Sequence, residues 1–154
     1  MEDPSETTRA RWEALPSWLL TQTAGHAHRL VADAFASVRA RGYHYRLLAA
    51  LEDFGPASQA ELGRRSGIYV SDMVTAVNEL AGQGLVRRDP DPSDRRRNII
   101  SPTAAGVRQL RRLEKQLAAC QEDLLAPLSP EERQRLTGLL STLLDHHNRP
   151  TGSA

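Results

Sequence analysis

The sequence lacks the features that mark secreted and membrane proteins. Cys120 is the single cysteine, which excludes an internal disulfide and favours a reducing compartment. No apolar run approaches the roughly 18 residues of a membrane span. The first twenty residues do not combine a basic start with an apolar core, as a secretory leader would. The sequence therefore predicts a cytoplasmic protein with no membrane partner.

Motifs of catalysis are also missing. The sequence has no glycine-rich phosphate loop, no nucleophile elbow and no His-Glu metal motif. Its five histidines do not form a spaced set with Cys, Asp or Glu of the kind that zinc sites use; they are His26, His28, His44, His146 and His147. We therefore expect no enzyme activity, no cofactor and no bound metal.

Lysine is almost absent. Lys115 is the one lysine among the 20 basic residues, and the others are arginines. The formal net charge of +1 is too small to indicate a polyanionic partner, so the positions of the arginines carry that argument. Arginine suits bidentate contacts to phosphate and guanine. An arginine-rich genome would produce the same bias.

Residues 58–100 predict a helix, a tight turn, a second helix and a hairpin. Ser58 and Glu61 have the spacing of a capping box, which begins the first helix. Gly67 can take the positive φ that a sharp turn needs. The second helix is expected over residues 70–81. Its predicted inward stripe consists of Val70, Val74, Val77 and Leu80.

The opposite face of this second helix carries small polar residues, namely Ser71, Asp72, Thr75 and Asn78. Such side chains can lie against base edges in a major groove. Phosphate would repel the carboxylate of Asp72, so this residue either accepts from a cytosine amino group or orients a neighbouring arginine. A face that is merely solvated is the alternative.

The hairpin has arginines at and beside its tip. Residues 85–88 and 95–100 are expected to form its strands, joined by a turn rich in Asp and Pro. Alternation along the second strand would send Arg95 and Arg97 to one face and Arg96 to the other. A charged hairpin that contacts only solvent is the alternative to a nucleic-acid contact.

This arrangement resembles the multiple antibiotic resistance regulator (MarR) family of winged helix-turn-helix transcription factors. The resemblance is carried by residues 60–65 and 78–88, and by Asp91-Pro92-Ser93-Asp94-Arg95-Arg96 leading into Thr103-Ala104-Ala105-Gly106. Members of the family often have Asp-Arg-Ser where this chain has Tyr69-Val70-Ser71. A usual helix cap and a usual phosphate-contacting arginine are therefore missing, and we predict no operator sequence.

The resemblance implies a mainly α fold, a single domain over residues 1–154. A winged helix-turn-helix unit at residues 43–101, with a small β-hairpin wing, would lie between long dimerisation helices at residues 17–42 and 102–147. A homodimer of this kind places two reading helices about 34 Å apart on an inverted repeat. The alternative is a monomer whose end helices fold over its own winged unit.

Local signals refine the end helices. The third long helix begins at Ser101 with Pro102, or else at Thr103, and Ser129 with Glu132 forms a second capping box. An apolar seam close to a heptad pattern comprises Leu110, Leu113, Leu117, Cys120 and Leu124. We expect Cys120 to pack on the dimer seam; redox sensing is the minor alternative. Residues 1–8 and 149–154 are expected to be loosely ordered.

The resemblance also implies roles for individual arginines. Arg95 would enter the minor groove, held in place by Asp94. The predicted phosphate contacts are Arg64, Arg65, Arg87 and Arg88. The complete set of predicted DNA-binding residues is Ser71, Asp72, Thr75, Asn78, Arg64, Arg65, Arg87, Arg88, Asp94, Arg95, Arg96 and Arg97. The partner is double-stranded DNA carrying an inverted repeat.

Members of the family commonly bind a small anionic or aromatic effector between the first helices and the winged unit. Candidates for that pocket are Trp18, His26, Arg29, His44 and Arg46, which alternatively belong to the core and the surface. The leading hypothesis is a homodimeric repressor released from its operator by such an effector. A winged-helix module that binds another protein is the second hypothesis.

Overall fold

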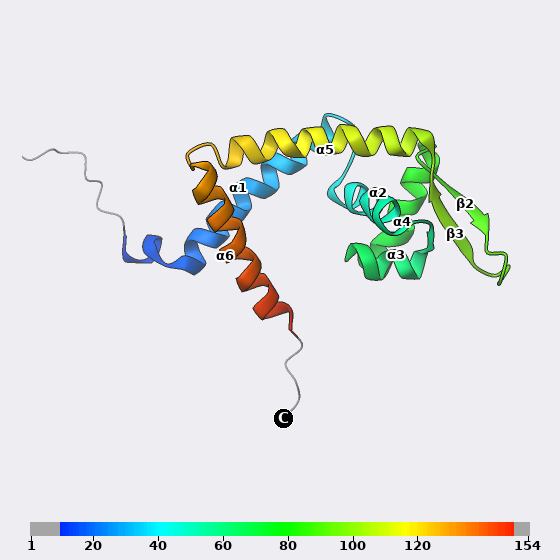
Figure 1. The fold of residues 1–154 in the computed structure, drawn as a ribbon, viewed down its shortest axis with the longest axis horizontal. Helices are drawn as coiled ribbons and strands as arrows, with labels where there is room; N and C mark the ends of the chain where they lie inside the picture. Colours follow the sequence, from blue (N-terminus) through cyan, green and yellow to red (C-terminus); the bar gives the residue numbers. More distant parts are fainter. Residues whose placement is uncertain (1–9, 150–154) are drawn as a thin grey trace, which may run out of the picture. The chain divides into compact units, whose positions relative to one another are not determined.

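The computed structural model describes residues 10–149, so the expectations for residues 1–8 and 150–154 lie outside the described residues. These residues form six α-helices, a short 3-10 helix and three strands. Figure 1 labels the α-helices and the strands β2 and β3. In chain order they are η1 (Arg11–Ala14), α1 (Pro16–Ala36), α2 (Gly42–Phe54), β1 (Ala57–Ser58), α3 (Gln59–Ser66), α4 (Val70–Gly82), β2 (Val86–Pro90), β3 (Asn98–Pro102), α5 (Ala104–Leu124) and α6 (Pro130–Asn148). No helix in this part of the chain is long and apolar enough to cross a membrane.

The chain forms two compact units that divide within α5, after Cys120. The first unit contains the core, which gathers buried apolar residues from α1, α2, α3, α4, the sheet and α5. The largest of its fully buried side chains are Phe35, Leu47, Leu48, Leu51, Leu62, Leu80, Ile100, Leu110, Leu113 and Val77. This core holds α3 and α4 in a fixed arrangement beside the sheet.

The predicted capping box at the start of α3 is confirmed. The Ser58 hydroxyl accepts the backbone N–H of Glu61 at 3.4 Å, and the Glu61 carboxylate accepts the N–H of Ser58 at 3.0 Å. Gly67 ends α3 with φ of 64°, in the left-handed region that favours glycine. Local chemistry therefore sets both ends of the first helix of the helix-turn-helix.

The phase of α4 differs from the prediction. Val77 and Leu80 are buried as expected, but Val70 is 83% exposed and Val74 is 49% exposed, so their assignment to the inward stripe is wrong. Met73 and Ala76 occupy those inward positions, with Ala76 fully buried. The inward face follows positions 73, 76, 77 and 80, which is equally good helical spacing.

The sheet has three antiparallel strands in the order β1-β3-β2, and β1 was not predicted. Its two residues pair with β3, with Ala57 opposite Ile100. The strands of the hairpin are also displaced, because β2 extends to Pro90 and β3 begins only at Asn98. The arginines at 95–97 therefore lie in the turn, and the predicted strand alternation among them is wrong.

The first long helix ends earlier than predicted, at Ala36 and not near residue 42. The carbonyl of Phe35 accepts the N–H groups of both Val38 and Ala40, and Arg39 has φ of 55°. This tight turn redirects the chain into α2. The structure thus has a definite corner where the sequence predicts continuous helix.

The start of α5 resolves the two predicted caps in favour of Thr103, whose hydroxyl accepts the N–H of Gly106 at 3.0 Å. The seam of α5 packs against the first unit's own core, where Leu110 and Leu113 are buried. The Cys120 thiol lies 3.5 Å from the carbonyl oxygen of Leu30, to which it donates. Cys120 is therefore buried inside the protomer, and its predicted place on a dimer seam stays a prediction.

The second capping box is confirmed at the start of α6, where the Ser129 hydroxyl accepts the N–H of Glu132 at 3.2 Å. No residue of α6 is buried in the described chain. Its leucines at positions 139, 140, 143 and 144 are between 40% and 60% exposed. Its own compact unit therefore does not cover the apolar side of this helix.

Candidate nucleic-acid interface

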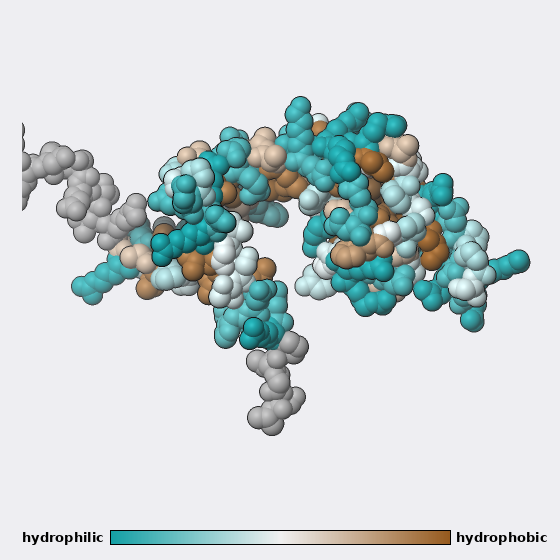
Figure 2. All heavy atoms as spheres, in the orientation of Figure 1, coloured by the Kyte–Doolittle hydropathy of each residue, from teal (hydrophilic) through white to brown (hydrophobic). Residues whose placement is uncertain are grey.

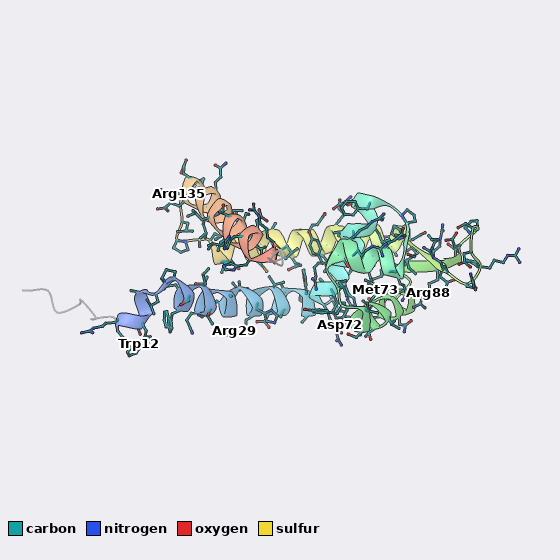
Figure 3. All side chains as sticks on the ribbon, turned by 90° about the horizontal axis from the view of Figure 1, so that it is seen from below. Trp12, Arg29, Asp72, Met73, Arg88 and Arg135 are labelled. Carbon is teal, nitrogen blue, oxygen red and sulfur yellow. The ribbon has the colours of Figure 1, made fainter. Side chains whose placement is uncertain are left out.

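The exposed face of α4 contains all four residues that the sequence assigns to base contacts. Ser71, Asp72, Thr75 and Asn78 are exposed together with Val70 and Val74. Figure 3 labels Asp72 on this helix, next to the buried Met73. The valines are the functional candidates that sequence reasoning missed, because they were assigned to the core. A sequence signal for them exists, since Met73 and Ala76 offer a second apolar stripe.

The candidate recognition helix, α4, and the wing are joined by a hydrogen bond. The guanidinium of Arg88 on β2 donates to the side-chain carbonyl oxygen of Asn78 on α4. Figure 3 labels Arg88 at the base of the wing beside α4. Two residues predicted to touch different parts of DNA, a base and a phosphate, therefore lie in contact.

Asp91 organises the entry to the turn of the wing. Its carboxylate accepts the hydroxyl of Ser93 at 2.7 Å and the backbone N–H of Ser93 at 2.8 Å. These two bonds, the hydroxyl first, hold the pKa of Asp91 below its usual value. The carboxylate consequently stays ionised and keeps the turn closed.

Asp94 does not hold Arg95, so that part of the prediction is wrong. The Asp94 carboxylate instead accepts Nε of Arg96 at 3.1 Å and the backbone N–H of Arg96 at 3.0 Å, which lowers its pKa. Arg95 is exposed, and within residues 10–149 no side-chain hydrogen bond or ion pair holds it. Figure 2 shows hydrophilic atoms at the end of the wing. The turn thus presents Arg95 while Arg96 is folded back.

The remaining predicted phosphate contacts have different surroundings. The guanidinium of Arg65 lies 5.5 Å from the centre of the Phe54 ring, and Nε of Arg87 pairs with Asp89 at 2.9 Å. Arg64 is exposed at the rim of a groove between α3 and α4. All three guanidinium groups remain open to solvent on at least one side, as phosphate contacts require.

That groove has a volume of about 500 Å³ and is mostly apolar. The turn between the helices contributes Ile68 and Tyr69 to its lining, and α4 contributes Val70, Met73 and Val74. Ile68 and Met73 are buried, whereas Tyr69 is 80% exposed. The first turns of α4 therefore present an apolar edge beside the polar side chains.

A buried polar cluster fixes the other end of α4. Glu79 accepts the hydroxyl of Tyr43 at 2.9 Å and Nε2 of His44 at 2.7 Å. Nδ1 of His44 accepts the backbone N–H of Arg41 at 3.1 Å, so the proton of the neutral ring resides on Nε2. Burial is the main cause that lowers the pKa of His44, and the Tyr43 hydrogen bond is the main cause that lowers the pKa of Glu79.

The predicted effector residues are not gathered in this way. His26 and Arg29 contact each other on α1, with Nδ1 and a guanidinium nitrogen 3.0 Å apart. Figure 3 shows Arg29 on that helix. His44 is committed to Glu79, and Arg46 donates to backbone carbonyls of the α3–α4 turn at 3.4 Å. Trp18 is half-buried near the start of α1. An effector role for these five residues stays a prediction.

The described residues include no cluster of three or more His, Cys, Asp or Glu side chains placed to hold a metal ion. The candidate site consists of the exposed polar face of α4, the basic wing and the fixed turn between α3 and α4. These are the parts of a winged helix-turn-helix, a class of DNA-binding fold.

Comparison with known proteins supports the resemblance. Residues 39–97 match the model of the MarR family, a stretch that covers α2, both helices of the helix-turn-helix and most of the wing. This match confirms the resemblance to the MarR family that the sequence motifs predict. Known relatives are named as transcriptional regulators and not as enzymes.

Two curated relatives and one solved structure illustrate the similarity. The chain is 36% identical over 99 residues to a putative transcriptional regulatory protein for the hcr operon of Thauera aromatica, across 64% of this chain and 60% of that protein. It is 33% identical over 98 residues to the transcriptional repressor NicR of Pseudomonas putida, across 64% of this chain and 62% of that protein. The chain thus spans about three fifths of the length of both.

The solved structure is the PcaV transcriptional regulator of Streptomyces coelicolor in complex with its natural ligand. It superposes with a TM-score of 0.73 at 28% identity, covering 89% of this chain and 96% of PcaV. This match confirms the predicted fold class, mainly α with a winged helix-turn-helix.

Proposed function

We propose that the protein is a sequence-specific transcriptional regulator that binds double-stranded DNA through α4 and the wing. The observation that carries this proposal is the bond between Arg88 and Asn78, because it couples the reading helix to the wing strand. One rigid unit then presents base-reading side chains and the unpaired Arg95 to the same duplex. The MarR relatives named as transcriptional regulators support this function.

The regulator acts as a homodimer on an inverted repeat. Support comes from the helices at the two ends of the chain, which leave large apolar side chains uncovered. Of the described α1, only Phe35 is buried, and α6 exposes four leucines at positions 139, 140, 143 and 144. Helices with such uncovered apolar faces are stabilised by pairing with a second copy. Two-fold symmetry would place the two reading helices about 34 Å apart.

The homodimer is a repressor, released from DNA when a small anionic or aromatic effector binds. The relative named as the repressor NicR supports the sign of regulation, and the ligand-bound structure of PcaV supports a small-molecule effector. Release requires that the effector favour the conformation that does not bind DNA, since equal affinity for both conformations shifts nothing.

The function is tested by fluorescence anisotropy on duplexes tiling the DNA upstream of the gene, compared with random duplexes across a salt series. We expect saturable binding to one inverted repeat with a clear margin over random DNA and a steep salt dependence. Binding no tighter than to random DNA at every salt concentration would refute sequence-specific regulation.

Arg95→Ala is expected to weaken operator binding by about 1–3 kcal/mol, because the free arginine at the wing tip makes a groove contact. Arg96→Ala should have the smaller effect, since Arg96 is already paired with Asp94. Arg112→Ala, at an exposed position on α5, is the control and should leave affinity unchanged. Equal affinities for all three variants would remove the wing tip from the interface.

Leu143→Glu is expected to convert the dimer to a monomer at micromolar concentration. The substitution places a charge on the apolar side of α6, where burial against a partner would leave the charge unpaired. Gln134→Glu adds the same charge on the opposite side of this helix and should leave the dimer intact. Sedimentation velocity distinguishes the two, and a dimeric Leu143→Glu variant would place the interface elsewhere.

A further inference from the structure

The proposed function leaves the apolar edge of α4 unexplained. Val70 is 83% exposed and Val74 is 49% exposed, although both are large apolar residues on the first turns of the reading helix. They are four positions apart, which places both on one face of the helix. Exposed Tyr69 precedes them, so apolar surface is continuous from the turn into α4.

The composition of α4 is unusual for a helix that would lie in a major groove. Residues 70–82 contain no arginine and no lysine, so α4 itself offers no guanidinium or ammonium group to the edge of guanine. Its exposed base-reading side chains are small and polar, and the two valines lie beside them at the edge of the groove with α3. The positive charge lies around this helix and not on it, at Arg64 on α3 and Arg88 on β2.

This charge pattern indicates which chemical group of a partner contacts the apolar edge of α4. Flanking arginines suit the two phosphate backbones that border a major groove, whereas a helix without positive charge suits the floor of that groove. Thymine is the base that presents a methyl group there, at C5. The N-terminal residues of a recognition helix are the ones that reach base edges, and Val70 and Val74 hold those positions.

We propose that Val70 and Val74 determine operator specificity by packing against the C5 methyl groups of thymines in the major groove. This inference rests on the proposed function, because it names the bases that the same interface reads. Each half-site therefore contains thymine where the first two turns of α4 cross the groove. Asp72, between the valines, would accept from the amino group of a neighbouring cytosine.

The test removes single methyl groups from the DNA. Each thymine of an operator selected from a randomised duplex pool is replaced by deoxyuridine, which keeps every hydrogen-bonding group and lacks only the methyl group. Affinity is measured by fluorescence anisotropy for the full-length protein and for Val70→Ala and Val74→Ala. Both valines are exposed, so their replacement leaves no cavity in the core.

We expect deoxyuridine to weaken binding of the wild-type protein about fourfold at each contacted thymine, the change that corresponds to one buried methyl group. In the variant that lacks the contacting valine, the same replacement should change affinity less than about 1.5-fold, because the methyl group has lost its partner. Val107→Ala, at a valine 38% exposed on α5, is the matched control and should keep the full fourfold sensitivity.

Three results would overturn the inference. Specific binding that is indifferent to every deoxyuridine would exclude methyl readout while leaving the proposed function intact. Equal sensitivity in the wild-type protein and both valine variants would assign the methyl contacts to other residues. Failure of the randomised pool to yield any preferred sequence would refute the proposed function and this inference together.

Discussion

Gly106→Ala is expected to destabilise the protein by about 3 kcal/mol or more. A Cβ atom at this position of α5 would lie 2.0 Å from the carbonyl oxygen of Leu85 and 3.0 Å from its carbonyl carbon. Both atoms belong to the backbone, so relief requires that α5 move away from the start of β2. Urea unfolding at a fixed protomer concentration measures the loss.

The surroundings of Gly106 explain why that movement is costly. The carbonyl of Leu85 accepts the N–H of Thr103 at 3.0 Å, and the hydroxyl of Thr103 donates to the carbonyl of Gly84 at 2.6 Å. These bonds join the first turn of α5 to the segment that leads into the wing. Separating the two backbones would break both bonds.

Gly82→Ala is the matched control for this prediction. Gly82 lies in the last turn of α4, where an added Cβ meets no heavy atom within 4 Å. Alanine is favoured over glycine in a helix by roughly 0.5–1 kcal/mol, so stability should be unchanged or slightly increased. Similar unfolding midpoints for the two variants would contradict the close approach at Gly106.

Glu79→Ala is expected to cost about 3 kcal/mol, the second large effect. The substitution removes the acceptor for the Tyr43 hydroxyl and for Nε2 of His44. His44 is 3% exposed, so the N–H group of its ring would be left without a partner and away from water. Thermal or urea unfolding measures the loss. A cost below about 1 kcal/mol would mean that water replaces the carboxylate.

The same cluster predicts how stability depends on pH. Burial lowers the pKa of folded His44 below its ordinary value of 6.5, so the unfolded chain binds a proton that the folded chain excludes. Its contribution is therefore complete above pH 6.5 and is lost as the pH falls towards the folded pKa. Glu79, whose pKa is lowered from 4.5, adds a further loss below pH 4.5.

His44→Gln separates the two contributions. A glutamine amide can donate to Glu79 but does not titrate, so the slope of stability just below pH 6.5 should flatten while the loss below pH 4.5 remains. An unchanged slope in this variant would show that another group titrates in that range.

Some features of this protein follow from a few neighbouring residues, and these could be predicted from sequence. The caps at Ser58 and Ser129 and the left-handed Gly67 depend on side chains and backbone within three or four positions. The motif Asp91-Pro92-Ser93-Asp94 likewise predicts a wing, because its carboxylates bond to groups two residues away. The resemblance to the MarR family rests on the same local motifs.

The phase of α4 shows where such local reasoning fails. Two apolar stripes satisfy helical spacing, one through Val70 and Val74 and the other through Met73 and Ala76. The core formed with α2 and α3 decided between them, since only one stripe can face that core. The sequence therefore offered both stripes, and the apolar edge on the exposed face of α4 could not be assigned from spacing alone.

The sequence alone determined the helices and the turns of the DNA-reading unit, its wing and its resemblance to a family, because each depends on short-range hydrogen bonding or on a contiguous motif. Only the tertiary structure decided the strand β1, the pairing of His44 with Glu79 and the close contact of Gly106 with Leu85. Each of these features joins residues that are 21 to 43 positions apart in the sequence and belong to different segments of the fold. Packing of the whole core brings such pairs together, and no local pattern records it.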